Sequence, residues 1–339
     1  MTEPSEEPVG GRATGPTPAA TAPGAPVGPA AALAGPMHEA GRYEGPPARR
    51  RAVLRRYVLV TKPRIIELLL ITTVPSMVVA EGGWPGTWLV IATVLGGTFS
   101  AASANALNNE LDRDIDRIMA RTSSRPTATD EVPAGHALRL GIALGVLGFV
   151  WLTVFVNVLA ASLATFAILF YVFVYTLGLK RRSSQAVVIG GVAGCMPVLT
   201  GWVAVPGAEL ADPRPWALFA VMFWWQPPHF WALAMKYRED YARAGLPMMP
   251  VTHGNDEATR QILLASYLLL TIVVISTLGL QAGWLYTVVA LLMTAWWLRY
   301  AHRLRRTRTI ADAMKLFHYS TVYISVVFIV AAVDAVLPR

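Results

Sequence analysis

The chain has 339 residues, of which 54% are hydrophobic and only 15% are charged. A soluble protein carries about 25% charged residues, so this composition excludes an ordinary soluble domain and indicates an integral membrane protein. The formal net charge of +8 does not indicate nucleic-acid binding, because the basic residues gather in alternate loops between apolar segments.

The N-terminal stretch differs from the rest of the chain. Residues 1–48 are rich in Pro, Ala, Gly and Thr and show no apolar periodicity. Such a composition does not bury enough apolar surface to fold, so we expect a disordered cytoplasmic tail over residues 1–48. It lacks the basic start and apolar core of a secretory signal, and it is not Arg-rich like a transit peptide. One polytopic domain is expected over residues 55–338.

Nine apolar segments follow, each near the roughly 20 residues that a helix needs to cross a bilayer core. Lipid offers no hydrogen-bond partners to the backbone, so runs of this length are helical. The sequence therefore predicts an all-α integral membrane protein, with nine transmembrane helices around a central cavity and a polar cytoplasmic cap. The segments are residues 62–80, 86–110, 136–157, 159–178, 185–205, 215–235, 260–280, 284–301 and 315–336.

The distribution of basic residues predicts the orientation of the chain in the membrane. Lys and Arg gather before the first segment and in the loops after the second, fourth, sixth and eighth segments. The positive-inside rule then places the N-terminus and these loops in the cytoplasm and the C-terminus outside. We expect a location in the bacterial cytoplasmic membrane. The single cysteine, Cys195, excludes an internal disulfide and lies among glycines in an apolar run, where a buried small side chain is expected.

The first segment begins with the sequence TKPR, which places Lys62 and Arg64 on either side of Pro63. Proline suits the first turn of a helix, so both cations should lie at the cytoplasmic edge of the membrane. They either add positive charge to a binding site there or serve only as topological anchors.

The second segment ends in NNELDRDIDRIMARTSSRP, from Asn108 to Pro126. Asn108, Asp112 and Asp116 are four residues apart, and a helix places such residues along one face; we call them the acidic stripe. Mg²⁺ prefers one or two carboxylates together with substrate phosphates. Arg121 and Arg125 follow as forked donors for phosphate. The alternative is a solvated amphipathic connector whose Asp and Arg side chains pair with each other.

A second polar cluster, residues 224–254, follows the sixth segment. Pro227 and Pro228 should interrupt the helix there, so backbone at this depth should line a cavity or be buried against protein. His229 comes next, as either a paired interior histidine or a ligand. Lys236, Tyr237, Arg238 and Asp240 then supply cations for phosphate and an acid for metal, although the two cations alone could be interfacial. We expect both clusters to line one polar pocket.

These motifs resemble the membrane prenyltransferases of the UbiA superfamily, whose helix 2 carries an Asn-(Asp)-x-x-Asp-x-x-x-Asp motif. The resemblance covers about residues 55–335. Within the superfamily, the motifs are most similar to those of the protohaem IX farnesyltransferase (haem O synthase) branch. This chain departs from the superfamily pattern at two positions. Asn109 stands where many members have Asp, and Ala244 stands four residues after Asp240, where the second motif usually has another Asp. The stretches that carry it are TKPR (61–64), the Asn108–Pro126 motif, GGVAGCMPVLTGW (190–202) and WQPPHFWALAMKYREDYARAGLPMMPV (225–251).

The resemblance implies Mg²⁺-dependent transfer of a farnesyl group from farnesyl diphosphate to a vinyl group of haem B, with a hydroxyl added from water. The products are haem O and diphosphate. Partners would be the lipid bilayer and a downstream haem A synthase or terminal oxidase assembly. The implied roles are metal binding by Asn108, Asp112 and Asp116; catalysis by Asp112, Asp116, Asp240, Lys236 and Tyr237; diphosphate binding by Arg121, Arg125, Lys236, Arg238, Lys62 and Arg64; and haem contact by His229.

Other functions remain open from the residues alone. A related prenyltransferase could act on an aromatic acid, a quinone precursor or chlorophyllide. A transporter would need carboxylates near the bilayer midplane and broken helices in matching halves, whereas here the carboxylates lie at the cytoplasmic ends of helices, with arginines between them. A haem-carrying scaffold would not need the acidic stripe.

Overall fold

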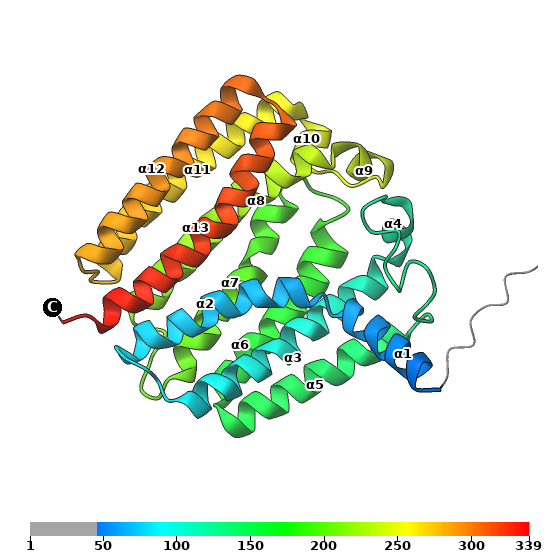
Figure 1. Cartoon of the computed structure of the whole chain (residues 1–339), viewed down its shortest axis with the longest axis horizontal. Helices are drawn as coiled ribbons and strands as arrows, with labels where there is room; N and C mark the ends of the chain where they lie inside the picture. The colour runs from blue at the N-terminus through cyan, green and yellow to red at the C-terminus, as the bar shows by residue number, and fades with distance from the viewer. Residues whose placement is uncertain (1–45, 339) are drawn as a thin grey trace, which may run out of the picture. The chain divides into compact units, whose positions relative to one another are not determined.

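The computed structural model describes residues 46–338, apart from the side chains of residues 46–50, 64, 65 and 67–69. Within that range the chain is helical and contains no β-strand (Figure 1). The helices are α1 (Pro46–Val60), α2 (Pro63–Glu81), α3 (Thr87–Leu111), α4 (Arg113–Ile118), α5 (His136–Phe155), α6 (Val158–Leu169), the π-helix η1 (Phe170–Leu179), α7 (Ala186–Ala204), α8 (Pro213–Lys236), α9 (Arg238–Arg243), α10 (Met249–Thr252), α11 (Gly254–Gly279), α12 (Trp284–Thr307) and α13 (Ile310–Val336).

The expected tail falls mostly outside the described residues. Helix α1 begins at Pro46, so the last three residues assigned to the tail, 46–48, are helical. The boundary of the folded domain at residue 55 stays a prediction.

Each of the nine predicted segments coincides with a helix, and residues 159–178 coincide with α6 and η1 together. Six spans among the described residues are long and apolar enough to cross a membrane, which supports a multi-pass membrane protein. The other three segments correspond to α2, which supplies only the shorter apolar stretch Leu70–Glu81, and to α8 and α12, which carry more polar residues. The six are α3, α5, α6 with η1, α7, α11 and α13.

The predicted interruption at Pro227 and Pro228 is wrong, because α8 continues through both residues. A proline removes one backbone N–H but can stay inside a helix that its surroundings hold in place. Both prolines are buried, and α8 packs against α7, α11 and α13. Tertiary packing therefore overrides the local signal, and the expectation that this stretch is buried against protein is confirmed.

Helices α3 and α5 pack closely because glycines of α5 leave room for side chains of α3. A Cβ atom at Gly141 would lie 2.7 Å from Cγ of Leu107, and one at Gly148 would lie 2.8 Å from Oγ of Ser100. Ser103 Oγ also donates to the Gly141 carbonyl at 2.7 Å. Close approach through small residues is the usual way in which membrane helices associate.

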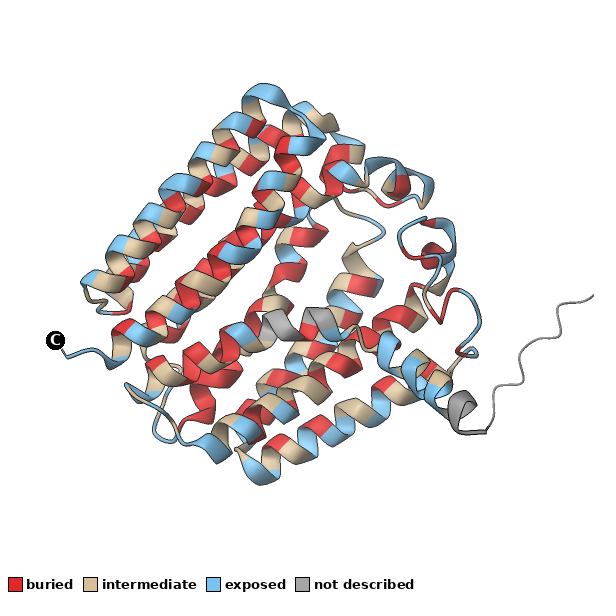
Figure 2. Cartoon of the chain, in the orientation of Figure 1, coloured by how far each residue is buried: buried red, intermediate tan, exposed pale blue. Residues whose placement is uncertain are grey.

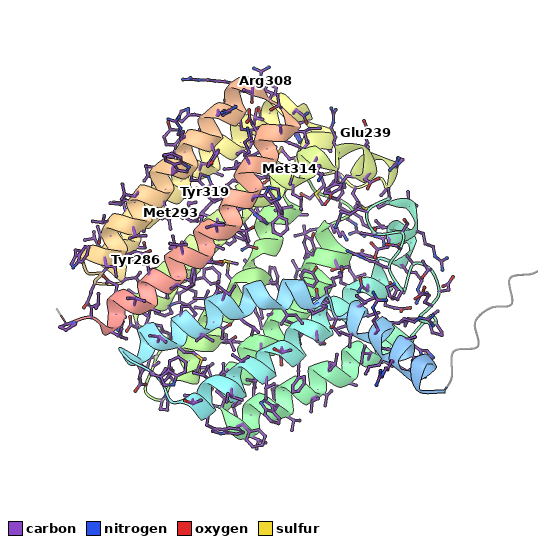
Figure 3. The ribbon with its side chains drawn as sticks, viewed as in Figure 1. Glu239, Tyr286, Met293, Arg308, Met314 and Tyr319 are labelled. Carbon is purple, nitrogen blue, oxygen red and sulfur yellow. The ribbon has the colours of Figure 1, made fainter. Side chains whose placement is uncertain are left out.

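Buried polar side chains in the α11–α12–α13 part pair with each other. Trp297 Nε1 donates to Ser266 Oγ at 2.9 Å, and the Tyr323 hydroxyl lies 2.8 Å from Thr294 Oγ1. Tyr319 donates its hydroxyl to the Met293 carbonyl at 2.8 Å (Figure 3). Buried residues gather on the faces between helices (Figure 2). Many exposed side chains are large and apolar, such as Leu278. Such outward apolar surface suits a lipid environment.

Candidate functional site

The acidic stripe lies where α3 gives way to α4. The helix is interrupted at Asp112, yet the Asp112 N–H donates to the Asn108 carbonyl at 2.9 Å and the Asp116 N–H to the Asp112 carbonyl at 2.8 Å. These hydrogen bonds have the spacing of an α-helix, so the three residues stay one helical turn apart through the interruption. Asn108, Asp112 and Asp116 are all buried, which is unusual for carboxylates unless they are paired.

A cation pairs with each member of the acidic stripe. Lys180 forms an ion pair with Asp112, and Arg125 Nη1 lies 2.9 and 2.7 Å from the two carboxylate oxygens of Asp116. Lys62 Nζ donates to Asn108 Oδ1 at 2.8 Å. We call these six residues the inner site. The carboxylates are paired, as the connector alternative predicts, but they are buried rather than solvated. Asp116 pairs with Arg125 of the same motif, whereas Asp112 pairs with Lys180 from a distant segment.

Lys180 is the member that sequence reasoning missed. It belongs to the run Lys180–Arg181–Arg182 after the fourth segment, and in the sequence this run indicates only the orientation of the chain in the membrane. In the fold, η1 carries this run to the end of α3, where Arg181 also bonds both oxygens of Asp114 at 2.7 Å. The available signal was a basic run in the same predicted compartment as the acidic stripe.

Lys62 lies beside two other cations. Lys62, Arg125 and Lys180 are like charges gathered around the acidic stripe, and each disfavours the charged form of its neighbours. A bound anion would favour the charged form, so the cations of the inner site suit a negatively charged ligand. The Arg64 side chain lies outside the described residues, and its predicted role stays a prediction.

The inner site fits a magnesium ion that shares its coordination with a ligand. Among the described residues, no three His, Cys, Asp or Glu side chains form a closed metal-binding group. Mg²⁺ does not need one, because one or two carboxylates plus substrate phosphates and water suffice. Oδ1 of Asp112 is buried and has no hydrogen-bond partner, which leaves one carboxylate oxygen available.

Asp240 joins the two polar loops. Its carboxylate accepts the backbone N–H groups of Ala120 at 3.2 Å and Arg121 at 3.1 Å, and it pairs with Arg243 on its own helix α9. Burial alone would raise the pKa of Asp240, but the two N–H groups and the Arg243 guanidinium outweigh burial and hold that pKa below its ordinary range. Asp240 is therefore a clamp between the loops, and the structure gives it no direct part in the inner site.

The remaining predicted cations lie nearer the surface. The Arg121 guanidinium lies 5.3 Å from the centre of the Tyr237 ring and the Lys236 ammonium 5.4 Å from it. Arg121, Lys236 and Arg238 are exposed. Together with Tyr237, these three cations form what we call the outer group. The clamp made by Asp240 holds their two loops together beside the inner site.

A cavity of about 300 Å³ lies between α2, α3, α6, η1, α7 and α8. Its walls are mostly apolar or small residues, and Asn105, one turn before Asn108, lies at its wall. The polar side chains of His229 and Gln226 also line it. The cavity thus combines an apolar interior with one end next to the acidic stripe, an arrangement suited to a lipid-like ligand with a charged head.

The π-helix η1 supplies two aromatic residues to this cavity. Tyr171 and Tyr175 both line it and stack with ring centres 5.2 Å apart. Thr176 Oγ1 donates to the Tyr171 carbonyl at 2.9 Å and receives a hydrogen bond from Asn108 at 3.2 Å. Such π-helical turns are rare and occur often at functional sites. Nothing in the residue pattern distinguished η1 from an α-helix.

His229 lies in the wall between α8 and α13. Its Nδ1 lies 2.5 Å from Ser320 Oγ, and its ring stacks between Trp225 and Phe317, with centres 4.3 and 4.5 Å away. The residue is thus a paired interior histidine that also faces the cavity.

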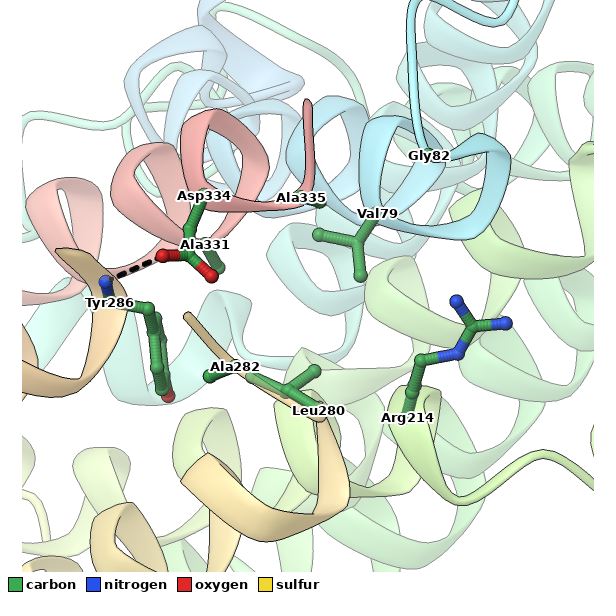
Figure 4. A pocket seen from close by; sticks show the side chains of 9 residues that line it. All are labelled: Val79, Gly82, Arg214, Leu280, Ala282, Tyr286, Ala331, Asp334 and Ala335. Carbon is green, nitrogen blue, oxygen red and sulfur yellow. Dashed lines mark hydrogen bonds between the residues drawn. The ribbon is translucent and has the colours of Figure 1, made fainter. Parts of the chain in front are cut away.

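The opposite ends of the helices contain none of the predicted site residues. A cavity of about 160 Å³ there is lined by Asp334, Tyr286 and Arg214, among others (Figure 4). Asp334 accepts the backbone N–H groups of Gly283 at 2.6 Å and Tyr286 at 3.0 Å, and Arg214 pairs with Asp212. These contacts cap helices, so we assign this end a structural role.

Comparison with known proteins identifies the relatives of this chain. Residues 69–327 match the UbiA prenyltransferase family. Protoheme IX farnesyltransferase 1 of Saccharopolyspora erythraea is 48% identical over 293 residues, which cover 86% of this chain and 93% of that protein. Protoheme IX farnesyltransferase of Nocardia farcinica is 48% identical over 299 residues, 86% of this chain and 94% of that protein.

Solved structures agree at the level of the fold. A UbiA homologue from Archaeoglobus fulgidus, bound to DMAPP and Mg²⁺, superposes with a TM-score of 0.66 at 19% identity, covering 83% of this chain and 99% of that one. A digeranylgeranylglyceryl phosphate synthase gives a TM-score of 0.69 at 17% identity, covering 84% of this chain and 99% of that one. From the family match and the close relatives we conclude that the chain belongs to the UbiA prenyltransferase family, in the branch of the protoheme IX farnesyltransferases.

Proposed function

We propose that this membrane prenyltransferase transfers the farnesyl group of farnesyl diphosphate to a vinyl group of haem B and adds a hydroxyl from water, which gives haem O and diphosphate. The name shared by its relatives supports the reaction. The observation that carries the assignment to a site is the buried Asp112 and Asp116 pair, with its cations, beside an apolar cavity.

Asn108, Asp112 and Asp116 would hold Mg²⁺ against the diphosphate, and the ion would neutralise charge on the leaving group. The donor set supports this assignment, as does Asp112 Oδ1, which accepts no hydrogen bond and lies 4.0 Å from the Arg181 guanidinium. The Archaeoglobus homologue with DMAPP and Mg²⁺ supports it at the level of the fold.

The cations of the inner site and the outer group would bind the diphosphate. Lys62, Arg125 and Lys180 are held in place by the acidic stripe before the ligand arrives, so little reorganisation is needed to stabilise the departing charge. Arg121, Lys236 and Arg238, with Arg64, would attract the anion from the cytoplasm. Tyr237 would position Arg121 and Lys236 through cation–π contacts with its ring.

The apolar cavity would hold the farnesyl chain and keep bulk water from the allylic cation. Tyr171 and Tyr175 lie along its wall, where their rings could stabilise positive charge. His229 remains our candidate for contact with the haem.

We also propose that all nine predicted segments cross the bilayer and that the inner site faces the cytoplasm. Lys62 precedes α2, Arg113 follows α3 and Lys180 follows η1, so basic residues gather at the helix ends that meet at the inner site, in agreement with the positive-inside rule. Diphosphate substrates and Mg²⁺ are then supplied from the same side.

The test is to incubate membranes containing the protein with haem B and farnesyl diphosphate, with Mg²⁺ or with EDTA, and to weigh the extracted haem by mass spectrometry. We expect a product heavier by a farnesyl group and a hydroxyl only with Mg²⁺. Unchanged haem, with diphosphate released when a quinone precursor is supplied, would instead indicate a different acceptor.

An Asp112→Asn variant in the same assay tests the metal assignment. It removes one charge from the acidic stripe and should lower turnover by about 10²–10³-fold, the usual cost of losing one preorganised electrostatic group. Asp114→Asn is the matched control, because Asp114 is two residues away and exposed. Equal activity of the two variants would contradict the role of Asp112.

A further inference from the structure

The proposed reaction needs one water molecule inside a largely apolar cavity, and two side chains of α8 provide hydrogen-bond acceptors there. Gln226 and His229 are three residues apart on α8, and both line the cavity. Both are buried, with 5% and 7% of their surfaces exposed. Residues at this spacing lie on the same face of a helix.

The hydrogen bonds around His229 fix which ring nitrogen carries the proton. Ser320 Oγ donates its only proton to the Phe317 carbonyl at 2.5 Å. The His229 Nδ1, 2.5 Å from the same oxygen, must therefore be the donor in that contact. The ring is buried and its Nδ1 contacts a hydroxyl rather than a carboxylate, so nothing in the described part of the chain stabilises a charged imidazolium and Nε2 keeps a free lone pair. No described residue bonds to Nε2.

Gln226 is oriented by its amide group. Nε2 donates to the Gly191 carbonyl at 2.9 Å and contacts Cys195 Sγ at 3.1 Å. Oε1 therefore turns away from these acceptors and lies against Gly194, where a Cβ atom would be only 2.7 Å away. Within the described part of the chain nothing donates to Oε1, so it is a second free acceptor.

We infer that Gln226 Oε1 and His229 Nε2 together bind the water molecule that hydroxylates the substrate, and that His229 accepts its proton. This inference rests on the proposed function. Two acceptors match the two protons of one water molecule and leave an oxygen lone pair free to react. His229 is then a general base, and histidine is the side chain that most often serves in general acid–base catalysis.

The electron flow follows from the chemistry of the vinyl group. The vinyl π electrons form a bond to C1 of the farnesyl group while the C1–O bond breaks and its electrons leave with the diphosphate. Positive charge remains on the vinyl carbon next to the porphyrin ring. The water oxygen then bonds to that carbon, and its proton passes to Nε2 of His229, which later releases it to solvent. One water is consumed and no oxidant is needed.

Without a held water molecule, the same cation can lose a proton from the adjacent methylene carbon. The product is then a farnesylated alkene that is lighter than haem O by one water. This difference in product distinguishes a catalytic role of His229 from a merely structural role, because a loosened fold lowers the total product without changing the ratio of alcohol to alkene.

The experiment compares the wild-type protein with His229→Ala and Gln226→Leu in membranes, with haem B, farnesyl diphosphate, Mg²⁺ and oxygen-18 water. The extracted haems are separated and weighed. We expect oxygen-18 haem O from the wild-type protein and an alkene share at least about tenfold larger in both variants, in keeping with the usual contribution of a general base. His318→Ala is the matched control, because His318 is exposed on α13 beside Phe317 and should keep the wild-type ratio.

Three results would overturn an assignment. Less haem O from both variants, with the alkene share unchanged, would overturn the water site and leave His229 as a haem contact. An alkene share raised equally in His318→Ala would also overturn it. No farnesylated haem of either kind from the wild-type protein would instead overturn the proposed function itself.

Discussion

Lys180 shows how single charges determine what the inner site can bind. Three cations, Lys62, Arg125 and Lys180, surround two buried carboxylates, Asp112 and Asp116, so the described side chains leave one positive charge in excess. A buried charge without a partner is costly. Lys180 and Arg125 compensate Asp112 and Asp116, whereas Lys62 bonds the neutral Asn108 and keeps its charge for an anionic ligand. An arriving diphosphate with Mg²⁺ can exchange partners with the pairs without moving the backbone.

Replacing Lys180 tests this balance. Lys180→Met removes the partner of Asp112 and one diphosphate contact, so we expect the KM for farnesyl diphosphate to rise by about tenfold, the equivalent of roughly 1.4 kcal/mol. Arg182→Met is the control, because Arg182 is an exposed cation two residues away. Steady-state kinetics in membranes measures both, and similar KM values for the two variants would show that only the overall positive charge of the run matters.

At the scale of secondary-structure elements, the positions of the helix ends determine where the charged residues of the site lie. The π-helix η1 places Tyr171 and Tyr175 along the cavity and delivers Lys180 to Asp112, whereas α9 carries Asp240 to the loop after α4. These contacts join segments that are more than 60 residues apart in the chain. The site therefore depends on the packing of these segments against each other, because no single helix supplies all of its residues.

Asp240 provides a test at this scale. Asp240→Asn should weaken the clamp and make the loops more accessible to trypsin, with faster cleavage after Arg121 and Arg243. Glu239→Gln is the matched control, because Glu239 is the exposed neighbour of Asp240 (Figure 3).

The clamp should also depend on pH. Because the folded structure lowers the pKa of Asp240, its carboxylate adds stability above the unfolded pKa and loses it as the pH falls through the folded pKa. Faster cleavage of the wild-type protein is thus expected only under acidic conditions; equal cleavage of both variants would refute the clamp.

Asp334 tests the opposite end of the bundle. Asp334→Ala leaves the N–H groups of Gly283 and Tyr286 without their acceptor, at a cost of about 1–3 kcal/mol for each buried group that stays unpaired. We expect a lower melting temperature in detergent with the product of the reaction unchanged. Glu209→Ala, an exposed acid at the same end, should melt like the wild-type protein. An unchanged melting temperature for Asp334→Ala would show that water replaces the carboxylate.

For the whole molecule, the number of crossings determines which sides of the membrane the two ends face. Six spans satisfy both length and composition, and α2, α8 and α12 must also cross if the nine-span topology holds. In α8, Gln226 and His229 line the cavity, and α12 carries Thr294 at a helix interface. The described side chains of α2 form only the shorter apolar stretch Leu70–Glu81.

Cysteine labelling tests the topology. Cys195 is buried, so cysteines introduced by Ser123→Cys and Glu209→Cys can be followed in intact cells with a reagent that does not cross membranes. Both positions are exposed. We expect label at position 209 in intact cells and at position 123 only after permeabilisation. Label at both positions without permeabilisation would refute the nine-span arrangement.

The sequence by itself determined the helical membrane class, the positions of all nine apolar segments and the acidic stripe. These are local properties, because length, hydropathy and one-turn spacing act within a single segment. Tertiary structure alone decided that α8 continues through Pro227 and Pro228, that Lys180 pairs with Asp112, and that Asp240 joins two loops. Those outcomes depend on contacts between distant segments, and the energy of a buried charge or a missing N–H is determined by the neighbours that packing supplies.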